Sequence, residues 1–248
     1  MPTSPMLQLA LDFVSLPAAL AIALKVADEV DIIEIGTPLC KAAGLEAIRA
    51  VREVCPDKLI LADLKSPDVG GLEAQMAFDA GADMMTVIGG AALATVESAL
   101  RVAQDMGKEM LMELTGVRDI IARAEEWREI GVERMVYHRG WDEQVFDRHW
   151  TPEDLVIIRQ LIDMGFRITV TGGITVDLLP FFKELPDLSS SPAGPSTRPR
   201  TRQPRLARSR IPSPACGVVQ AETWLPALLL PTSLPGPCVL ASAKWACG

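Results

Sequence analysis

The chain has 248 residues, of which 49% are hydrophobic and 23% charged, a balance typical of a globular protein. Its formal net charge of −8 is unevenly spread: residues 1–186 carry 17 basic and 30 acidic side chains, whereas residues 187–248 carry seven and two. The acidic body disfavours nucleic acid as the main partner, and we identify neither a membrane span nor a signal peptide.

Seven short apolar segments alternate with longer amphipathic segments along the first 170 residues. Several short segments lack a two-residue alternation, as expected of parallel strands that are buried on both faces. The expected strands are residues 6–11, 31–35, 59–62, 84–88, 109–112, 134–137 and 167–170. The expected helices are residues 16–27, 45–54, 72–80, 92–106, 119–129 and 152–164.

A row of βα units predicts either a doubly wound sheet or a barrel. No dinucleotide-binding glycine pattern follows the first strand, and polar residues follow most strands. We therefore expect an α/β protein with a (β/α)₈ TIM barrel, whose catalytic domain spans residues 1–186.

The repeating pattern stops near Asp187. Residues 187–248 contain ten prolines, a serine run and several arginines, and they show neither helical nor strand periodicity. Such a composition does not favour an eighth strand and helix. We expect the eighth βα unit to be lost and residues 187–248 to form a disordered or frameshifted tail.

Polar and glycine residues lie at or near the carboxyl ends of the predicted strands. In a barrel these ends meet on one rim, where active sites are built, so we expect the residues to surround one site. A Thr-Gly-Gly string after the seventh strand fits a phosphate loop, because glycines expose backbone N–H groups. The candidates are Asp12, Glu34, Asp63, Lys65, Asp68, Glu113, His138, Arg139, Thr171, Gly172 and Gly173, whereas His149 is expected to be structural.

The residue types indicate the chemistry. The carboxylates of Glu34 and Asp63 are hard oxygen ligands that suit Mg²⁺. Lys65, which lies between Asp63 and Asp68 in the sequence, should stay protonated and can stabilise a developing enolate. His138 can act as a general acid or base near neutral pH.

Four strings resemble the 3-keto-L-gulonate-6-phosphate decarboxylases, a family of the orotidine monophosphate decarboxylase suprafamily. They are Ala62-Asp63-Leu64-Lys65-x-x-Asp68, Glu113-Leu114-Thr115-Gly116, Tyr137-His138-Arg139 and Val170-Thr171-Gly172-Gly173. The first string marks the whole suprafamily, whereas the second and third favour this family over its aldolase relative, 3-hexulose-6-phosphate synthase. The likeness spans residues 6–186 and implies a ribulose-phosphate-binding type of barrel.

The resemblance implies a carboxy-lyase that converts 3-keto-L-gulonate 6-phosphate to L-xylulose 5-phosphate in L-ascorbate utilisation. The reaction would pass through an enediolate stabilised by Lys65, with its proton organised and delivered by Glu113 and His138. The implied metal is Mg²⁺ on Glu34 and Asp63. The implied substrate contacts are Asp12, Arg139, Thr171, Gly172 and Gly173.

The resemblance also implies a homodimer, in which Asp68 reaches the partner's site. The five cysteines show no metal-ligand spacing, which favours a reducing, cytoplasmic location. A membrane or nucleic-acid partner is not expected.

The chain departs from the family pattern at two places. Trp141 stands where members often have an arginine, three residues after the histidine. The family's eighth strand, roughly Val-Phe-Ile-Ala-Gly-Arg, is replaced by residues 189–196. Codons for these residues, read one base upstream, can encode Val-Phe-Ile-Ala-Gly-Arg-Ala-Ile. We therefore hypothesise a frameshift near Asp187, which the nucleotide sequence of the gene would test.

Alternatives to a decarboxylase stay open. The aldolase of the suprafamily uses a similar enediolate, so the residues alone do not separate the two enzymes. A third alternative is an inactive, truncated barrel whose sheet has two open edges. A binding partner for the basic tail is a fourth, and charge runs of this kind are usually solvated.

Overall fold

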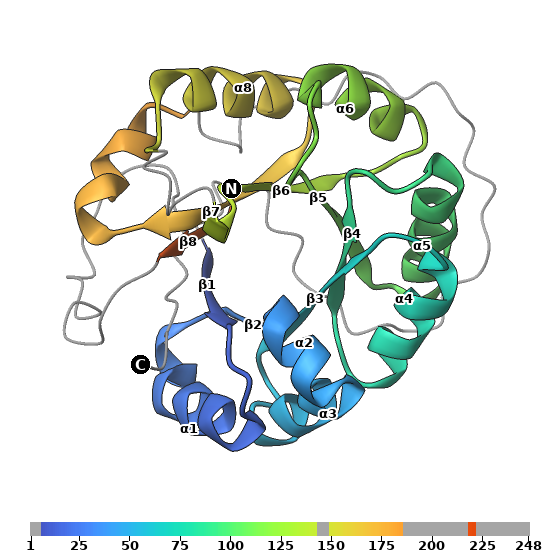
Figure 1. Ribbon diagram of the computed structural model, residues 1–248, viewed down its shortest axis with the longest axis vertical. Helices are drawn as coiled ribbons and strands as arrows, with labels where there is room; N and C mark the ends of the chain where they lie inside the picture. Colours follow the sequence, from blue (N-terminus) through green and yellow to red (C-terminus); the bar gives the residue numbers. More distant parts are fainter. Residues whose placement is uncertain (1–5, 143–148, 186–217, 222–248) are drawn as a thin grey trace.

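Eight parallel strands form the centre of the molecule and close into a barrel in the order β1 to β8 (Figure 1). This computed structural model describes residues 6–142, 149–185 and 218–221. The expected TIM-barrel class is confirmed, and the seven predicted strands lie at their expected places. The strands are β1 Met6–Leu11, β2 Ile32–Ile35, β3 Leu59–Ser66, β4 Met84–Ile88, β5 Glu109–Glu113, β6 Arg134–His138, β7 Arg167–Ile174 and β8 Val218–Ala221.

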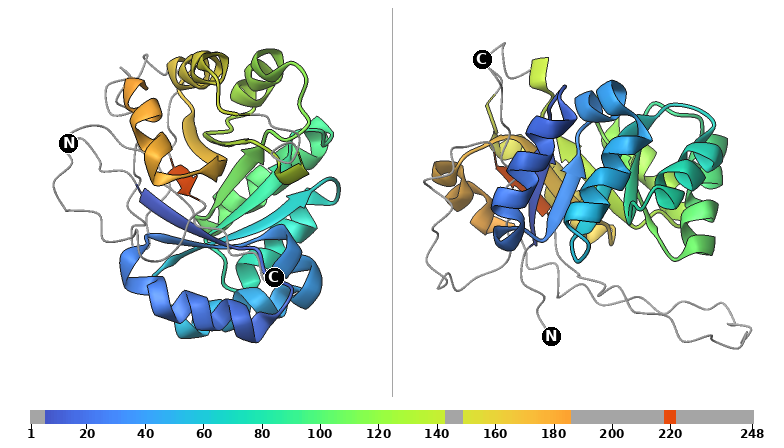
Figure 2. Two further views of the ribbon diagram at one scale, coloured as in Figure 1. Left: turned by 60° about the vertical axis from the view of Figure 1, so that its left-hand side comes forward. Right: turned by 90° about the horizontal axis from the view of Figure 1, so that it is seen from below.

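Helices surround the strands, as both views of Figure 2 show. Six of the α-helices match the predicted ones to within two residues, and α2, η1 and η2 are additional. The α-helices are α1 Leu16–Val26, α2 Thr37–Ala43, α3 Leu45–Val54, α4 Gly70–Asp79, α5 Leu93–Met106, α6 Ile120–Glu129 and α8 Pro152–Asp163; the 3₁₀ helices are η1 Ala27–Glu29 and η2 Val176–Glu184. Among the described residues, no helix is long and apolar enough to cross a membrane.

The core explains why the strands are apolar on both faces. All four residues of β2 are buried, because side chains fill the barrel and helices cover its outside. On the helix side, α3 buries Ala47, Ile48 and Val51, which share one face at three- and four-residue spacing. Glu34 is the charged exception within β2, so its burial needs a reason in the site.

The eighth position of the barrel corrects our expectation for the tail. A four-residue strand, β8, lies parallel between β7 and β1; Val218 pairs with both Thr169 and Met6. Residues 218–221 therefore differ from the expected tail, whereas the expectation for the rest of residues 187–248 stays a prediction. This segment contains no proline and begins with two β-branched residues, which favour a strand next to unpaired edges.

The rest of the eighth unit lies outside the described residues. This applies to residues 189–196, on which the frameshift hypothesis rests, and to the residues after Ala221. The division into a catalytic domain and a tail at residue 186 stays a prediction. The two open sheet edges expected of a truncated barrel are not present, because β8 pairs with both.

Strand β3 is longer than predicted and is irregular at its carboxyl end. Its pairing with β4 shifts between Ala62 and Ser66. Residues 63–65 therefore leave the regular ladder at the rim of the barrel, and the Asp-x-Lys part of the sequence motif lies within this irregularity.

Candidate active site

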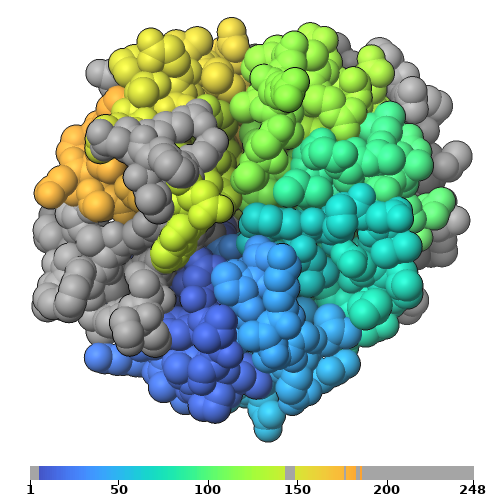
Figure 3. Space-filling view, in the orientation of Figure 1, coloured from blue at the N-terminus to red at the C-terminus, as the bar shows by residue number. Residues whose placement is uncertain are grey.

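A cavity of about 810 Å³ lies at the carboxyl ends of the strands. In the space-filling view, a hollow lies near the centre of this face, between blue segments and a yellow-green one (Figure 3). The predicted residues that line the cavity are Asp12, Glu34, Asp63, Lys65, Glu113, His138 and Thr171. The barrel thus brings together side chains from six strands or the segments directly after them, as the rim argument predicts.

Four predicted residues do not line this cavity. Arg139 lines a neighbouring cavity of about 250 Å³, which also contacts His138. Asp68 is exposed, and its carboxylate accepts a hydrogen bond from the backbone N–H of Val69. Gly172 and Gly173 follow the cavity-lining residue Thr171 on β7. His149, expected to be structural, is exposed and lines neither cavity.

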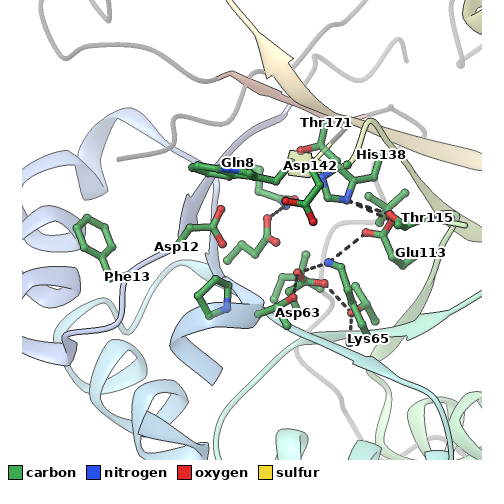
Figure 4. Close-up of a pocket in the computed structure, with 18 of the residues that line it drawn as sticks. Gln8, Asp12, Phe13, Asp63, Lys65, Glu113, Thr115, His138, Asp142 and Thr171 are labelled. Atoms are coloured by element: carbon green, nitrogen blue, oxygen red, sulfur yellow. Dashed lines mark hydrogen bonds and ion pairs between the residues drawn. The ribbon is translucent and has the colours of Figure 1, made fainter. Parts of the chain in front are cut away.

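Lys65 lies between two carboxylates in the cavity (Figure 4). Its ammonium forms an ion pair with Asp63, and its Nζ lies 3.4 Å from Oε2 of Glu113. Burial favours the neutral amine, but the two carboxylates outweigh burial and raise the pKa of Lys65 above its ordinary value. The Lys65 side chain is therefore a fixed positive charge at neutral pH, as the sequence predicts.

The same ammonium keeps its partners ionised. Burial acts to raise the pKa of both carboxyl groups, but the charge of Lys65 and hydrogen bonds bring the pKa of Asp63 below its ordinary value. The pKa of Glu113 is lowered strongly by Lys65 and by His138. Lys65, Asp63 and Glu113 therefore form an ionic network inside the cavity, and His138 lies beside Glu113.

Glu113 and Thr115 hold the ring of His138. The hydroxyl of Thr115 donates to Oε1 of Glu113 at 2.6 Å and lies 3.2 Å from Nδ1 of His138. The same Nδ1 lies 3.4 Å from Oε1 of Glu113. On the other side of the ring, Nε2 is buried and has no hydrogen-bond partner among the described residues. The ring is thus fixed through one nitrogen, and the other is available to a ligand.

Glu34 is a carboxyl group whose ionised form the site disfavours. It is buried, and its Oε2 accepts a hydrogen bond of 2.6 Å from Nε2 of Gln8. Burial and the neighbouring carboxylates of Asp63 and Asp12 raise the pKa of Glu34 well above its ordinary value. The described residues contain no group of three His, Cys, Asp or Glu side chains arranged to hold a metal ion. Within this part of the chain, any metal would need ligands besides protein side chains.

The Thr-Gly-Gly string has a geometry that only glycine allows. Gly172 has a φ of 101°, and a Cβ on it would lie 2.1 Å from the backbone oxygen of Arg139. Nε1 of the buried Trp150 donates to the Gly172 carbonyl oxygen at 2.9 Å. The hydroxyl of Thr171 is buried without a hydrogen-bond partner among the described residues, although Thr171 lines the cavity. An unpaired buried hydroxyl at a cavity indicates a ligand group.

The sequence analysis missed several polar residues of the cavity. Gln8, Thr37, Thr86 and Thr115 line it, and each holds a predicted charged residue by a hydrogen bond. A signal for two of them is present in the sequence, since Gln8 and Thr86 interrupt otherwise apolar strands. Trp141 and Asp142 also line the cavity, and Asp142 is drawn beside His138 in Figure 4.

Comparison with known proteins agrees with the motifs. Residues 5–186 match the profile of a family described as "Orotidine 5'-phosphate decarboxylase / HUMPS family". The 3-keto-L-gulonate-6-phosphate decarboxylase SgbH of Escherichia coli (strain K12) is 47% identical over 181 residues, which are 73% of this chain and 82% of SgbH.

Solved structures give the same picture. The structure of KGPDC from Streptococcus mutans in complex with D-R5P has a TM-score of 0.71 and 37% identity, over 73% of this chain and 84% of that one. The 3-hexulose-6-phosphate synthase of Salmonella typhimurium has a TM-score of 0.68 and 39% identity, over 73% and 84%. Relatives named decarboxylases confirm the expected enzyme class, a carboxy-lyase. The chain therefore belongs to the orotidine 5'-phosphate decarboxylase / HUMPS family.

Proposed function

We propose that this protein decarboxylates 3-keto-L-gulonate 6-phosphate to L-xylulose 5-phosphate, as a cytoplasmic enzyme of L-ascorbate utilisation. The observation that carries the proposal is the Lys65 ammonium, held between Asp63 and Glu113 in the cavity. Loss of CO₂ from a keto acid leaves an enediolate, and a fixed positive charge beside it lowers the barrier to its formation. The 47% identity to a curated decarboxylase of this substrate supports the assignment.

His138 is the proposed proton donor to the enediolate. Its Nδ1 is fixed by Thr115 and Glu113, and its Nε2 is the nitrogen without a partner among the described residues. A ring oriented in this way can deliver a proton to one side of a bound intermediate. Oε1 of Glu113 lies 3.4 Å from Nδ1 of His138, so this carboxylate can stabilise the ring whenever it carries the proton to be donated.

Glu34 and Asp63 are the proposed ligands of Mg²⁺. The fit rests on Glu34: a buried carboxylate beside two others is costly to ionise, and a divalent cation would offset that cost. Because two carboxylates are few for this ion, substrate oxygens and water would complete its ligands. When bound, the ion would polarise the substrate oxygens.

The other predicted contacts concern substrate binding. We place the substrate hydroxyls beside Asp12, at the wall of the cavity. We assign the phosphate to the Thr171 hydroxyl and the backbone of Gly172 and Gly173, with help from Arg139. The unpartnered hydroxyl of Thr171 supports this side of the cavity as the phosphate end.

A homodimer is part of the proposal. Asp68 is exposed and is followed by an apolar stripe, Val69 directly before α4 and Leu72 and Met76 on that helix, which expose 55%, 61% and 41% of their surfaces. Leu72 and Met76 are four residues apart and therefore share one helix face. A second copy of the chain would cover the stripe and bring its own Asp68 to the neighbouring site. We propose neither a nucleic-acid nor a membrane partner.

The aldolase remains a second candidate function. It is favoured by the 39% identity to a solved 3-hexulose-6-phosphate synthase, and by Trp141 at a cavity position where decarboxylases of the family often have arginine. The two functions use different substrates, so separate assays distinguish them. CO₂ release from 3-keto-L-gulonate 6-phosphate reports the first, and formaldehyde-dependent consumption of ribulose 5-phosphate reports the second.

The test compares these two assays in the purified chain with added Mg²⁺. We expect CO₂ release as the faster activity, and Lys65→Ala to lower its kcat by about 10²- to 10³-fold. Lys108→Ala is the matched control, since Lys108 also pairs with a carboxylate, Asp83, near the amino ends of the strands. Formaldehyde condensation as the main activity would replace the decarboxylase by the aldolase. Absence of both activities would favour the inactive barrel.

A further inference from the structure

At the break in the β3–β4 ladder, β3 has more residues than the part of β4 that lies opposite. Regular pairing stops at Ala62 and resumes at Ser66, so that residues 63–65 of β3 lie opposite a single residue of β4, Thr86. An insertion of this kind bends a strand and removes backbone groups from the ladder. Something other than the neighbouring strand must therefore hold these three residues.

The backbone of Lys65 has a conformation that needs support. Its φ of 50° lies in the left-handed region, which costs a non-glycine residue on the order of 1–3 kcal/mol. Its backbone N–H donates to the Oγ1 of Thr86 at 2.9 Å rather than to a strand carbonyl. The Thr86 hydroxyl thus takes the place of the missing ladder acceptor.

The same hydroxyl also orients Asp63. Oγ1 of Thr86 donates to Oδ1 of Asp63 at 2.8 Å, and both side chains are buried. Because a hydroxyl has one proton, its donation to Asp63 leaves its lone pairs to accept from Lys65. One oxygen atom therefore joins the backbone of the lysine to the carboxylate that pairs with its ammonium.

We infer that Thr86 is a positioning residue, whose hydroxyl holds the Asp63–Lys65 segment in the geometry that places the Lys65 ammonium between Asp63 and Glu113. Removing the hydroxyl leaves a buried N–H and a buried carboxylate oxygen each with one hydrogen bond fewer. The segment 63–65 then has no anchor on β4, and Nζ of Lys65 moves from its place 3.4 Å from Oε2 of Glu113. Thr86 itself donates and accepts only within the protein, so it contacts no reacting atom in this role.

The first test separates the hydroxyl from the shape of the side chain. Thr86→Val keeps the branched shape and removes both hydrogen bonds, whereas Thr86→Ser keeps the hydroxyl. We expect Thr86→Val to lower kcat by about 10²-fold with a change in KM below about threefold, because small misplacements of catalytic groups cost this much. Thr86→Ser should retain kcat within about threefold. Thr95→Val is the control, since Thr95 is buried on α5 and does not line the cavity.

The kcat and KM measurements rest on the proposed function, whereas the second test does not. Each variant is labelled with limiting acetic anhydride at neutral pH, and mass spectrometry measures the acetylation rate of Lys65 relative to the other lysines. We expect Lys65 to become several-fold more reactive in Thr86→Val, since its ammonium leaves the two carboxylates. The rate should be unchanged in Thr86→Ser and Thr95→Val. A wild-type chain without decarboxylase activity would refute the proposed function and leave this comparison intact.

Two results would overturn the inference. One is a Thr86→Val variant with wild-type kcat and wild-type Lys65 labelling. The other is an equal loss in Thr86→Val and Thr86→Ser, because it would show that a hydroxyl at position 86 does not preserve the geometry of the site. If Thr86→Val does not fold, Thr86→Cys offers a similar volume with a weak hydrogen-bonding group. An unchanged kcat and labelling rate in Thr86→Cys would likewise refute the role.

Discussion

At the scale of single residues, the site contrasts two kinds of buried carboxylate. Glu113 and Asp63 are stabilised in the charged form by Lys65, and their pKa values are lowered. At Glu34, burial and the nearby carboxylates outweigh the charge of Lys65 and the hydrogen bond from Gln8, and they raise the pKa. Ionisation of Glu34 therefore costs stability, and the proposed cation would offset this cost.

Replacement of Glu34 by glutamine tests this cost. The pKa of Glu34 is higher in the folded chain than its value of about 4.3 in an unfolded one, so the unfolded chain ionises first and wild-type stability falls as pH rises through this window. Without Mg²⁺ at pH 7, Glu34→Gln should raise Tm by about 2–5 °C, as expected for a gain of about 1 kcal/mol.

Addition of Mg²⁺ should reverse that order. We expect the ion to stabilise the wild type in thermal unfolding and to leave Glu34→Gln unchanged, because one of the two proposed ligands is gone. Equal stabilisation of both proteins by Mg²⁺ would remove Glu34 from the metal site.

Gly172 provides a second test at this scale. An alanine there meets two penalties, a φ of 101° and a Cβ 2.1 Å from the Arg139 carbonyl oxygen. Gly165 is a matched control, with a φ of 96° and nothing within 4 Å of a Cβ. We expect Gly165→Ala to lose about 1–2 kcal/mol in urea unfolding, and Gly172→Ala to lose clearly more. The KM of Gly172→Ala for the phosphorylated substrate should also rise. Equal losses of unfolding free energy in the two variants would show that the Arg139 backbone moves away from the added Cβ at little cost.

At the scale of elements, α4 carries the test of assembly. Leu72 belongs to the apolar stripe of this helix and exposes 61% of its surface, and Leu24 on α1 exposes 58%. Leu72→Arg should convert a dimer to monomers in sedimentation velocity, whereas Leu24→Arg should not. Decarboxylation should fall together with the dimer, since Asp68 is proposed to act in the partner's site. A monomeric wild type would remove this part of the proposal.

The strands and long helices could be predicted because their patterns are local. Apolar runs such as β2 have clear sequence signals, and so do capped helices such as α8, which has Thr151 as its N-cap and begins at Pro152. The helix α2 was missed because seven residues are too few for a repeated apolar spacing. Strand β8 was missed because its four residues lie in a proline-rich segment. They form a strand only because the edges of β7 and β1 offer them hydrogen-bonding partners.

The candidate site divides in the same way. Charged residues such as Lys65 and Glu113 follow apolar strands, so their shared rim is predictable from order alone. The residues that hold them are not, because Thr86 and Thr37 reach Asp63 from other strands or helices. Such contacts depend on strand register, and the irregular pairing of β3 with β4 has no counterpart in any short sequence pattern.

At the scale of the whole molecule, closure of the barrel depends on β8. A chain that ends at residue 217 leaves the edges of β7 and β1 unpaired, and a chain that ends at residue 221 keeps them paired. We expect the shorter chain to aggregate or to unfold at least several degrees lower in a thermal melt. The longer one should unfold like the full chain. Equal melting of all three would show that β8 contributes nothing to stability.

The pairing of Met6 with Val218 also determines the order in which the protein can fold. Each of the first seven strands pairs with a neighbour in sequence, whereas the β1–β8 seam joins nearly opposite ends of the chain. Contacts of such high sequence separation form late, because the entropy of closing a long loop must be overcome first. The seam should accordingly be the first part of the sheet to exchange its amide hydrogens with deuterium, with β3 to β5 the slowest.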